Sequence, residues 1–528
     1  MPSTERDSLL GKFSTPFKGK SQNKVYAFDL LYHPFGQHQS PSSKKNVIFM
    51  VTDGMGPASV SLARSYRQYR DKLPYGDVLT IDKHFIGSSR TRSSDSLITD
   101  SAAGATAFSC GLKSYNGAIG VTADQKPCGT VLEALKLQGY LTGLVVTTRI
   151  TDATPAAFSS HVKTRWFEDL IAQHQIGDYP LGRMVDLMIG GGRTHFYPPT
   201  DTKYGSRGSR ADDRNLIDEA IENGWSYIGN RSTFDEAVQS GVSLPLMALL
   251  EDGDIPFDLD RDEQVYPSLE ESAKLALETL SKATKDSEKG FFLMIEGSRI
   301  DHAGHNNDPA AQVNEVLAYD KAFAAVLKFA DESDVETIIV STSDHETGGL
   351  ATARQISPSY PEYVWFPEVL YNVQHSGEYL SRALREYEGD DVETYVKEEI
   401  FERGLGFKTY TAEEVKKVVK HKNTAHYILN ELVSLRSETG WSTHGHSAVD
   451  VNIYAYSNRK VTFMESILGA LQGNRENTEI GQFLQSFTGV TSNVEEITEL
   501  IKDTQVEPAK GKSIDVESVQ EDYHKGLY

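Results

Sequence analysis

Cysteine is scarce in this sequence. Its 528 residues include two cysteines, Cys110 and Cys128, and neither belongs to a C-x-x-C pair. Two cysteines can form at most one bridge, which excludes a scaffold built on several disulfides and a zinc site made of cysteine pairs. Whether these two are joined is left open by their spacing.

Long apolar runs are also absent. No stretch reaches the ~18 apolar residues that a membrane-spanning helix needs. The first residues lack the basic-then-apolar layout of a signal peptide. We therefore expect no membrane span in this chain.

Positive charge is in short supply. The sequence has 53 Lys and Arg against 75 Asp and Glu, which gives a net charge of −22. This excess repels a polyphosphate backbone, so we expect no nucleic acid partner. Small phosphorylated substrates are compatible with it, because bound metal ions can dominate the local field. The hydrophobic share of 39% is that of a folded protein with a sizeable core.

The first 43 residues are rich in Ser, Lys, Gln and Pro and show no sustained periodicity, so we expect a tail there. Within it, Glu5, Leu9 and Leu10 have the form of an acidic dileucine sorting signal. This short pattern predicts a sorting adaptor as a partner.

From residue 44 onward, short continuous apolar runs alternate with segments that carry helix signals. Such runs are typical of strands buried on both faces. They predict an α/β fold with a doubly wound, mostly parallel central sheet flanked by helices, whose ligands bind beyond the carboxyl ends of the strands. The runs are 47–51, 143–147, 185–189, 291–295, 337–340 and 451–456.

We expect one catalytic domain over residues 44–485. Residues 351–442 contain charged helical patterns and no long buried strand, which indicates an insertion of the crown type. Residues 486–528 are acidic and helical at first, and we expect a C-terminal helix and a tail there.

Carboxylates and imidazoles follow several of these strands, as a metal site requires. The densest segment runs from Glu296 to His305, where Asp301 and His305 are spaced i, i+4 and would face one cation. Other candidates are Asp53, the adjacent Asp344 and His345, and one of the two histidines His444 and His446, between which spacing does not decide.

A candidate nucleophile, Ser101, opens a run of small residues that predicts a tightly packed helix. A helix N-terminus stabilises an anion, but a serine also needs a base or a metal ion to react. Asp152, Thr154 and Arg165 lie in one loop-to-helix passage, and the planar guanidinium of Arg165 suits a phosphate.

Six motifs in this order resemble the alkaline phosphatase family, over about residues 44–485, and the fungal vacuolar members most of all. They are D-G-M-G at 53–56, T-D-S-A-A-G-A-T-A at 99–107, D-A-T-P-A-A at 152–157, E-G-S-R-I-D-H-A-G-H at 296–305, S-D-H-E-T-G-G at 343–349 and H-G-H-S at 444–447.

The resemblance implies two zinc ions and one magnesium ion. One Zn²⁺ would be held by Asp301, His305 and His446, and the other by Asp53, Asp344 and His345 together with Ser101. The Mg²⁺ would be held by Asp53, Thr154 and Glu296, with Asp152 and His302 behind them. Arg165 would clamp the phosphate.

The same resemblance implies broad hydrolysis of phosphate monoesters, from small molecules or phosphoproteins, through a phosphoserine intermediate. It also implies a homodimer and a vacuolar location, where the sequon at Asn230 would be glycosylated. The alternatives are a sulfatase, phosphodiesterase or mutase of the same superfamily, and a catalytically silent metal- or phosphate-binding scaffold. Ser101 lacks the C/S-x-P-x-R setting of sulfatases, and no ligand or nucleophile is missing, which favours a phosphatase.

Overall fold

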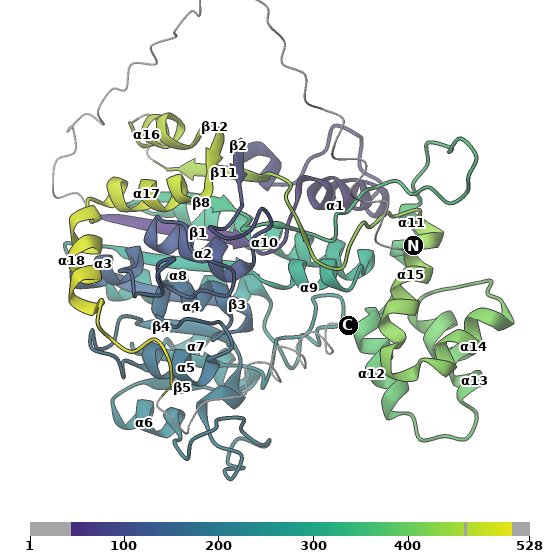
Figure 1. Cartoon of the computed structure of the whole chain (residues 1–528), viewed down its shortest axis with the longest axis horizontal. Coiled ribbons are helices and arrows are strands. Elements are labelled where there is room, and N and C mark those ends of the chain that lie inside the picture. Colours follow the sequence, from purple (N-terminus) through teal and green to yellow (C-terminus); the bar gives the residue numbers. More distant parts are fainter. Residues whose placement is uncertain (1–43, 459–461, 509–528) are drawn as a thin grey trace, which may run out of the picture. The chain divides into compact units, whose positions relative to one another are not determined.

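The computed structural model describes residues 44–458 and 462–508 (Figure 1). The expected tail over 1–43, with the sorting pattern at Glu5, Leu9 and Leu10, lies outside the described residues, as does the end of the chain from 509. Within the described ranges, no helix combines the length and the hydrophobicity that crossing a membrane requires.

A ten-stranded sheet forms the centre of the described chain. Strand β11 runs antiparallel to its two neighbours, β2 and β8, and the remaining neighbouring strands pair in parallel. In spatial order the strands are β12 (Gly473–Glu476), β2 (Phe85–Arg90), β11 (Val451–Ser457), β8 (Glu336–Thr342), β1 (Lys45–Thr52), β7 (Phe291–Gly297), β3 (Leu141–Arg149), β4 (Leu187–Gly191), β6 (Leu246–Leu249) and β5 (Ser226–Ile228). The predicted α/β class, with a mostly parallel sheet, is confirmed.

The central strand β1 shows why continuous apolar runs become inner strands. All of its residues are buried, and successive side chains enter different halves of the core. Ile48 and Met50 pack on one face of the sheet, whereas Val47, Phe49 and Val51 pack on the other. A strand covered on both faces has no polar side, so its sequence shows no alternation.

Helices cover both faces of the sheet (Figure 1). The side chains of α1 (Pro57–Arg70), α8 (Leu269–Ala283) and α10 (Pro309–Glu332) share a core with Ile48 and Met50. The other face is covered by α2 (Ser101–Cys110), α3 (Val131–Leu137), α4 (Ala153–Ser159), α17 (Asn477–Thr488) and α18 (Thr491–Ile501). The remaining helices outside the insertion are η1 (Ile81–His84), α5 (Glu168–Ile176), η2 (Arg193–Phe196), α6 (Leu216–Glu222), α7 (Arg231–Ser240), α9 (Arg299–His305) and α16 (Thr462–Leu471).

Residues 351–442, drawn in green in Figure 1, contain helices and no strand longer than an isolated bridge. The bridge joins Ala351 to Gly440, which brings the two ends of the segment together. Its helices are α11 (Pro367–Asn372), α12 (Gly377–Glu386), α13 (Val392–Tyr395), η3 (Val396–Gly404), α14 (Ala412–Lys420), η4 (Lys422–Thr424) and α15 (Ala425–Ser437). Helix α17 extends across residue 485, the expected end of the catalytic domain, and α18 follows it.

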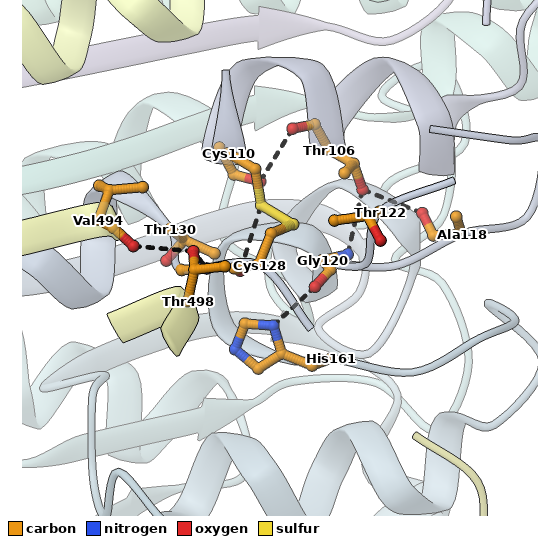
Figure 2. Close-up of a disulfide and its surroundings, with 12 residues drawn as sticks. Thr106, Cys110, Ala118, Gly120, Thr122, Cys128, Thr130, His161, Val494 and Thr498 are labelled. Atoms are coloured by element: carbon orange, nitrogen blue, oxygen red, sulfur yellow. Dashed lines mark hydrogen bonds between the residues drawn. A yellow bond between two sulfur atoms is a disulfide. The ribbon is translucent and has the colours of Figure 1, made fainter. Parts of the chain in front are cut away.

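The two cysteines form a disulfide, which their spacing had left open (Figure 2). Cys110 is the last residue of α2, and Cys128 lies in the loop before α3, with their Cα atoms 6.1 Å apart. Figure 2 shows that the backbone carbonyl of Gly120, beside this bridge, accepts a hydrogen bond from the ring of His161. The disulfide therefore fixes the end of the helix that begins at Ser101.

Candidate metal centre

Four neighbouring strands deliver polar side chains to one edge of the sheet. In spatial order these strands are β8, β1, β7 and β3. Parallel strands end at the same edge, so side chains far apart in sequence converge there. Asp344 and His345 follow β8, Asp53 follows β1, Glu296 is the last residue but one of β7, and Asp152 and Thr154 follow β3.

Ser101 is the first residue of α2, and its helix places it against the end of β8. Asp100 caps this helix by accepting a hydrogen bond from the backbone N–H of Ala103 at 3.0 Å. The Ser101 hydroxyl is buried, and its Oγ lies 3.1 Å from Nε2 of His345. Gly104 allows this approach, because a Cβ at that position would stand 3.0 Å from Cβ of Asp344.

Asp301 and His305, on α9, meet His446 from the short strand β10 (His446–Ser447). The Nε2 atom of His446 lies 3.1 Å from Nε2 of His305 and 3.5 Å from a carboxylate oxygen of Asp301. His444 instead packs its ring edge-on against Tyr427 and hydrogen bonds through Nδ1 to the carbonyl of His305. Of the two histidines that spacing left open, His446 is the one that joins the cluster.

Hydrogen bonds fix the orientation of the three clustered imidazoles. Each uses Nδ1 for a hydrogen bond, which directs Nε2 toward the cluster, the arrangement common among metal-binding histidines. The Nδ1 acceptors are the carbonyl of His444 for His305, the carbonyl of Thr99 for His446, and the hydroxyl of Thr347 for His345.

Thr347 was not identified from the sequence. It lies in the short strand β9 (Glu346–Thr347), and its hydroxyl donates a hydrogen bond to Asp301 while also lying 3.2 Å from Nδ1 of His345. One hydroxyl therefore orients two members of the cluster. The only signal in the sequence is its place two residues after His345, which does not reveal the partner Asp301.

Among the residues that the structure describes, two groups of three side chains come close enough to hold a metal ion. In each group the candidate ligand atoms lie within 4.8 Å of one another. One group is Asp53, Asp344 and His345, which is the set expected for one zinc ion. The other is Asp301, His345 and His446; His305, expected beside Asp301 and His446, contacts both of them.

Four buried oxygen atoms at this edge of the sheet have no hydrogen-bond partner. Buried polar atoms are nearly always paired in folded proteins, so a group of orphaned oxygens indicates that a cation belongs there. They are Oδ1 of Asp53, Oγ1 of Thr154, Oε1 of Glu296 and Oδ2 of Asp344. All four belong to residues that the sequence identified.

The carboxylates repel one another in the absence of a cation. Burial, followed by the charges of Asp344 and Asp301, raises the pKa of Asp53 well above its ordinary value. Burial and neighbouring carboxylates also raise the pKa of Asp344 to about 7 and that of Glu296 to about 8. Cations would relieve this repulsion. The donor set of carboxylates, imidazoles and hydroxyls therefore fits Zn²⁺ and Mg²⁺.

Arg165 lies beside this cluster and is held by a carboxylate. Its NH2 donates to Oδ1 of Asp152 at 2.8 Å. Burial opposes ionisation of Asp152, yet the guanidinium groups of Arg149 and Arg165 hold its pKa well below the usual range. An ionised Asp152 fixes the planar fork of Arg165, which matches two oxygens of a phosphate.

Behind Asp152 lies an ion-pair network that the sequence did not indicate. Arg149 donates to Asp254 at 2.8 Å and to Glu168 at 2.9 Å. His302, expected near the magnesium ligands, lies 3.6 Å from a carboxylate oxygen of Asp254 and accepts a hydrogen bond from Nε of Arg299 at 3.2 Å. Arg149 also lies 3.5 Å from Asp152. The network therefore links Asp152 to β3, which ends at Arg149, and to α9, which contains His302.

The cluster combines a hydroxyl at a helix N-terminus, converging metal-ligand groups and a guanidinium. Anions bind favourably at such a helix end. Metal ions can activate a hydroxyl, and an arginine can hold a transferring phosphoryl group. The arrangement therefore has the parts for phosphoryl transfer.

Comparisons with known proteins agree with this chemistry. The family model described as alkaline phosphatase matches residues 44–490. The chain is 60% identical over 487 residues to the repressible alkaline phosphatase of Saccharomyces cerevisiae, covering 89% of this chain and 85% of that protein. It is similar in structure to the cold-active alkaline phosphatase of Shewanella sp., with a TM-score of 0.69 and 29% identity over 84% of this chain and 99% of that one. It is also similar to a His-to-Glu variant of TAB5 alkaline phosphatase with Mg bound in its M3 site, with a TM-score of 0.57 and 26% identity over 85% and 99% of the two chains.

The family match extends over most of the chain and includes all six motifs found in the sequence. The resemblance predicted from those motifs is confirmed. The candidate metal-binding groups lie where the motifs converge. This chain therefore belongs to the alkaline phosphatase family of metal-dependent enzymes that hydrolyse phosphate monoesters.

Proposed function

We propose that this enzyme hydrolyses phosphate monoesters of broad structure in two displacements, with Ser101 as the nucleophile and a phosphoserine as the intermediate. The position of Ser101 carries the proposal. Ser101 is the first residue of α2. Its hydroxyl lies 3.1 Å from Nε2 of His345, beside the group formed by Asp53, Asp344 and His345.

We further propose which residues hold the metal ions. Asp301, His305 and His446 would hold one Zn²⁺, and Asp53, Asp344 and His345 the other, next to Ser101. Asp53, Thr154 and Glu296 would hold Mg²⁺, with Asp152 and His302 behind them. When bound, these cations lower the pKa of ligated hydroxyls and water and neutralise charge that develops on oxygen. The orphaned oxygens of Asp53, Thr154 and Glu296 support the magnesium assignment.

In the first displacement, Oγ of Ser101 forms a bond to phosphorus while the bond between phosphorus and the alcohol oxygen breaks. The serine loses its proton, and the departing alcohol gains one from solvent. Arg165 holds two non-bridging oxygens of the phosphoryl group, oriented by its hydrogen bond to Asp152. The N-terminus of α2 favours the negative charge on this group.

In the second displacement, the oxygen of a water molecule forms a bond to phosphorus while the bond to Oγ of Ser101 breaks. The water loses a proton, Ser101 regains one, and inorganic phosphate leaves. Arg165 holds the same two oxygens through both steps, so one clamp serves attack and release. The substrates are phosphorylated small molecules or phosphoproteins, and the net charge of −22 disfavours nucleic acid.

We also propose that the enzyme matures in an oxidising lumen and acts as a homodimer in the vacuole. The disulfide between Cys110 and Cys128 supports such a compartment. Asn230 supports glycosylation, because it is exposed and caps α7 through Oδ1, which leaves the amide nitrogen for a sugar. The dimer, the vacuolar location and a sorting adaptor at Glu5, Leu9 and Leu10 rest on the family resemblance.

Two measurements test the mechanism. Hydrolysis of p-nitrophenyl phosphate at mildly alkaline pH should stop after EDTA treatment and return when zinc and magnesium are restored. Acid quenching during turnover, followed by mass spectrometry, should find a phosphate on the peptide that contains Ser101. A fully active enzyme that carries no phosphate on this peptide, at any quench time, would overturn the proposed intermediate.

A further inference from the structure

The two carboxylate oxygens of Glu296 have different surroundings. Oε2 accepts a hydrogen bond from the hydroxyl of Ser298 at 2.6 Å. Oε1 is buried and makes no hydrogen bond of ordinary distance and angle, and the hydroxyl of Thr154 lies near enough to lower the pKa of Glu296. A donor that fixes one oxygen of a carboxylate also fixes the orientation in which the other oxygen meets a cation.

The hydroxyl of Ser298 is itself held in place by a neighbouring strand. It accepts a hydrogen bond from the backbone N–H of Thr147 at 3.1 Å, and Oγ1 of Thr147 accepts one from the backbone N–H of Ser298, also at 3.1 Å. A serine hydroxyl carries a single proton, so this acceptor role leaves that proton for Glu296. Thr147 belongs to β3, the strand that leads to Thr154.

An ordinary structural role for Ser298 does not account for this bond. Ser298 occupies the N-cap position of α9, where serine normally accepts a hydrogen bond from the first turn of the helix. Its side chain makes no capping hydrogen bond there. The backbone of Ser298 is helical there (φ −74°, ψ −30°), not extended as in a capping serine, and its hydroxyl is directed to Glu296.

We infer that Ser298 is a positioning residue for magnesium, aiming Oε1 of Glu296 toward the orphaned oxygens of Thr154 and Asp53. The inference rests on the magnesium assignment in the proposed function. Ser298 contacts neither the phosphate nor the cation in this scheme and acts only through Glu296. The backbone N–H of Thr147 holds the hydroxyl of Ser298 in place, and a change of the Thr147 side chain leaves that donor intact.

The test is Mg²⁺ binding to the purified, zinc-loaded enzyme after magnesium has been stripped, measured by calorimetry with Mg²⁺ alone. Ser298→Ala should weaken Mg²⁺ binding about 10- to 100-fold, as the loss of a bond behind a ligand does elsewhere. Activity of this variant should return at high Mg²⁺. Ser298→Thr, which keeps a hydroxyl, should restore the affinity to within about 3-fold of the wild type.

Thr147→Val is the matched control, because it removes the other half of the reciprocal pair and leaves the hydroxyl of Ser298 in place. Its Mg²⁺ affinity should stay near that of the wild type. An equal loss in Thr147→Val and Ser298→Ala, or no loss in Ser298→Ala, would overturn the role of Ser298. Glu296→Gln tests the magnesium assignment separately from the role of Ser298. If Glu296→Gln also leaves Mg²⁺ binding unchanged, the magnesium assignment itself fails, and the role of Ser298 with it.

Discussion

Two buried polar clusters in this enzyme contain the same kinds of residues but differ in how those residues are arranged. The metal-site cluster contains Asp53, Ser101, Asp344 and His345, and the His161 cluster contains Glu133, Ser160, His161 and His174. Each has a carboxylate, a histidine and a serine whose hydroxyl meets an imidazole: Ser101 lies 3.1 Å from His345, and Ser160 lies 2.8 Å from His174.

The difference is how each cluster balances its charge. In the His161 cluster the protein supplies every partner, because Nε2 of His161 lies 2.7 Å from Glu133 and Nδ1 lies 2.8 Å from the carbonyl of Gly120. Burial opposes protonation, but the Glu133 charge raises the pKa of His161. In the metal-site cluster, Oδ1 of Asp53 and Oδ2 of Asp344 lie 3.4 and 3.2 Å from Nε2 of His345 but make no hydrogen bond, and the carboxylates repel one another. The contrast supports a structural role for the His161 cluster and ligand binding by the metal-site cluster.

The largest expected contrast is between the two serines. Ser101→Ala should lower kcat roughly 10⁴-fold or more, because the nucleophile is lost. Ser160→Ala should leave kcat within about 2-fold and cost about 1 kcal/mol of unfolding free energy, the value of one hydrogen bond. Steady-state kinetics and urea unfolding measure both. A Ser160→Ala variant as inactive as Ser101→Ala would remove the distinction between the clusters.

Removing one charge from each cluster should change stability in opposite directions. Glu133→Gln takes the charged partner from His161 and should destabilise the protein by about 2 kcal/mol. Asp53→Asn relieves repulsion and should stabilise the metal-free protein by about 1 kcal/mol at pH 9, while abolishing metal-dependent activity. Urea unfolding in EDTA compares the two variants. A destabilised metal-free Asp53→Asn protein would contradict the repulsion argument.

The pH dependence of stability should differ between the metal-free and metal-loaded proteins. Folding raises the pKa of Asp344 to about 7 and of Glu296 to about 8, from unfolded values near ~3.9 and ~4.3. The metal-free native state therefore holds more protons than the unfolded state, and its free energy of unfolding should fall by up to about 9 kcal/mol as pH rises from about 4 to about 8. His161 titrates in the metal-free and the metal-loaded protein alike, so its contribution cancels when the two pH profiles of stability are subtracted. Unfolding curves with EDTA or with metals would show this; parallel pH profiles would refute it.

The smallest expected effect concerns the hydroxyl that joins Asp301 to His345. Thr347→Val should weaken zinc binding about 10-fold, or about 1.4 kcal/mol, because both ligands lose their orienting bond. Thr498→Val is its counterpart near the disulfide, where the hydroxyl accepts a hydrogen bond from Gly129 at 2.8 Å. That variant should leave zinc affinity unchanged. Competition with a zinc-binding dye measures both affinities.

Much of the fold and of the site could be predicted because the signals are local. Continuous apolar runs marked the inner strands, and Asp53, Glu296 and Asp344 stand at or just after their ends. The edge strands β5 and β12 and the inner strands β2 and β6 were missed, because short strands, or strands without a continuous apolar run, look like loops in sequence.

The parts that could not be predicted depend on contacts between distant segments. Ser298 and Thr147 are 151 residues apart, and neither has a neighbour in sequence that reveals the other. Spacing alone did not choose between His444 and His446; the family resemblance gave His446, and the structure shows the ring of His446 beside Asp301. Arg149 was passed over because its partner Asp254 lies on another loop.

The order of the site residues along the chain also sets when the site can assemble during synthesis on the ribosome. Asp53 is among the first folded residues to be made, whereas His446 comes about 400 residues later, on the far side of the insertion. At about 5–20 residues per second, the nascent chain carries its early carboxylates for roughly 20–80 s before the last imidazole is made. The proposed zinc set containing His446 therefore cannot be complete until His446 has been made, after every residue of the other two proposed metal sets.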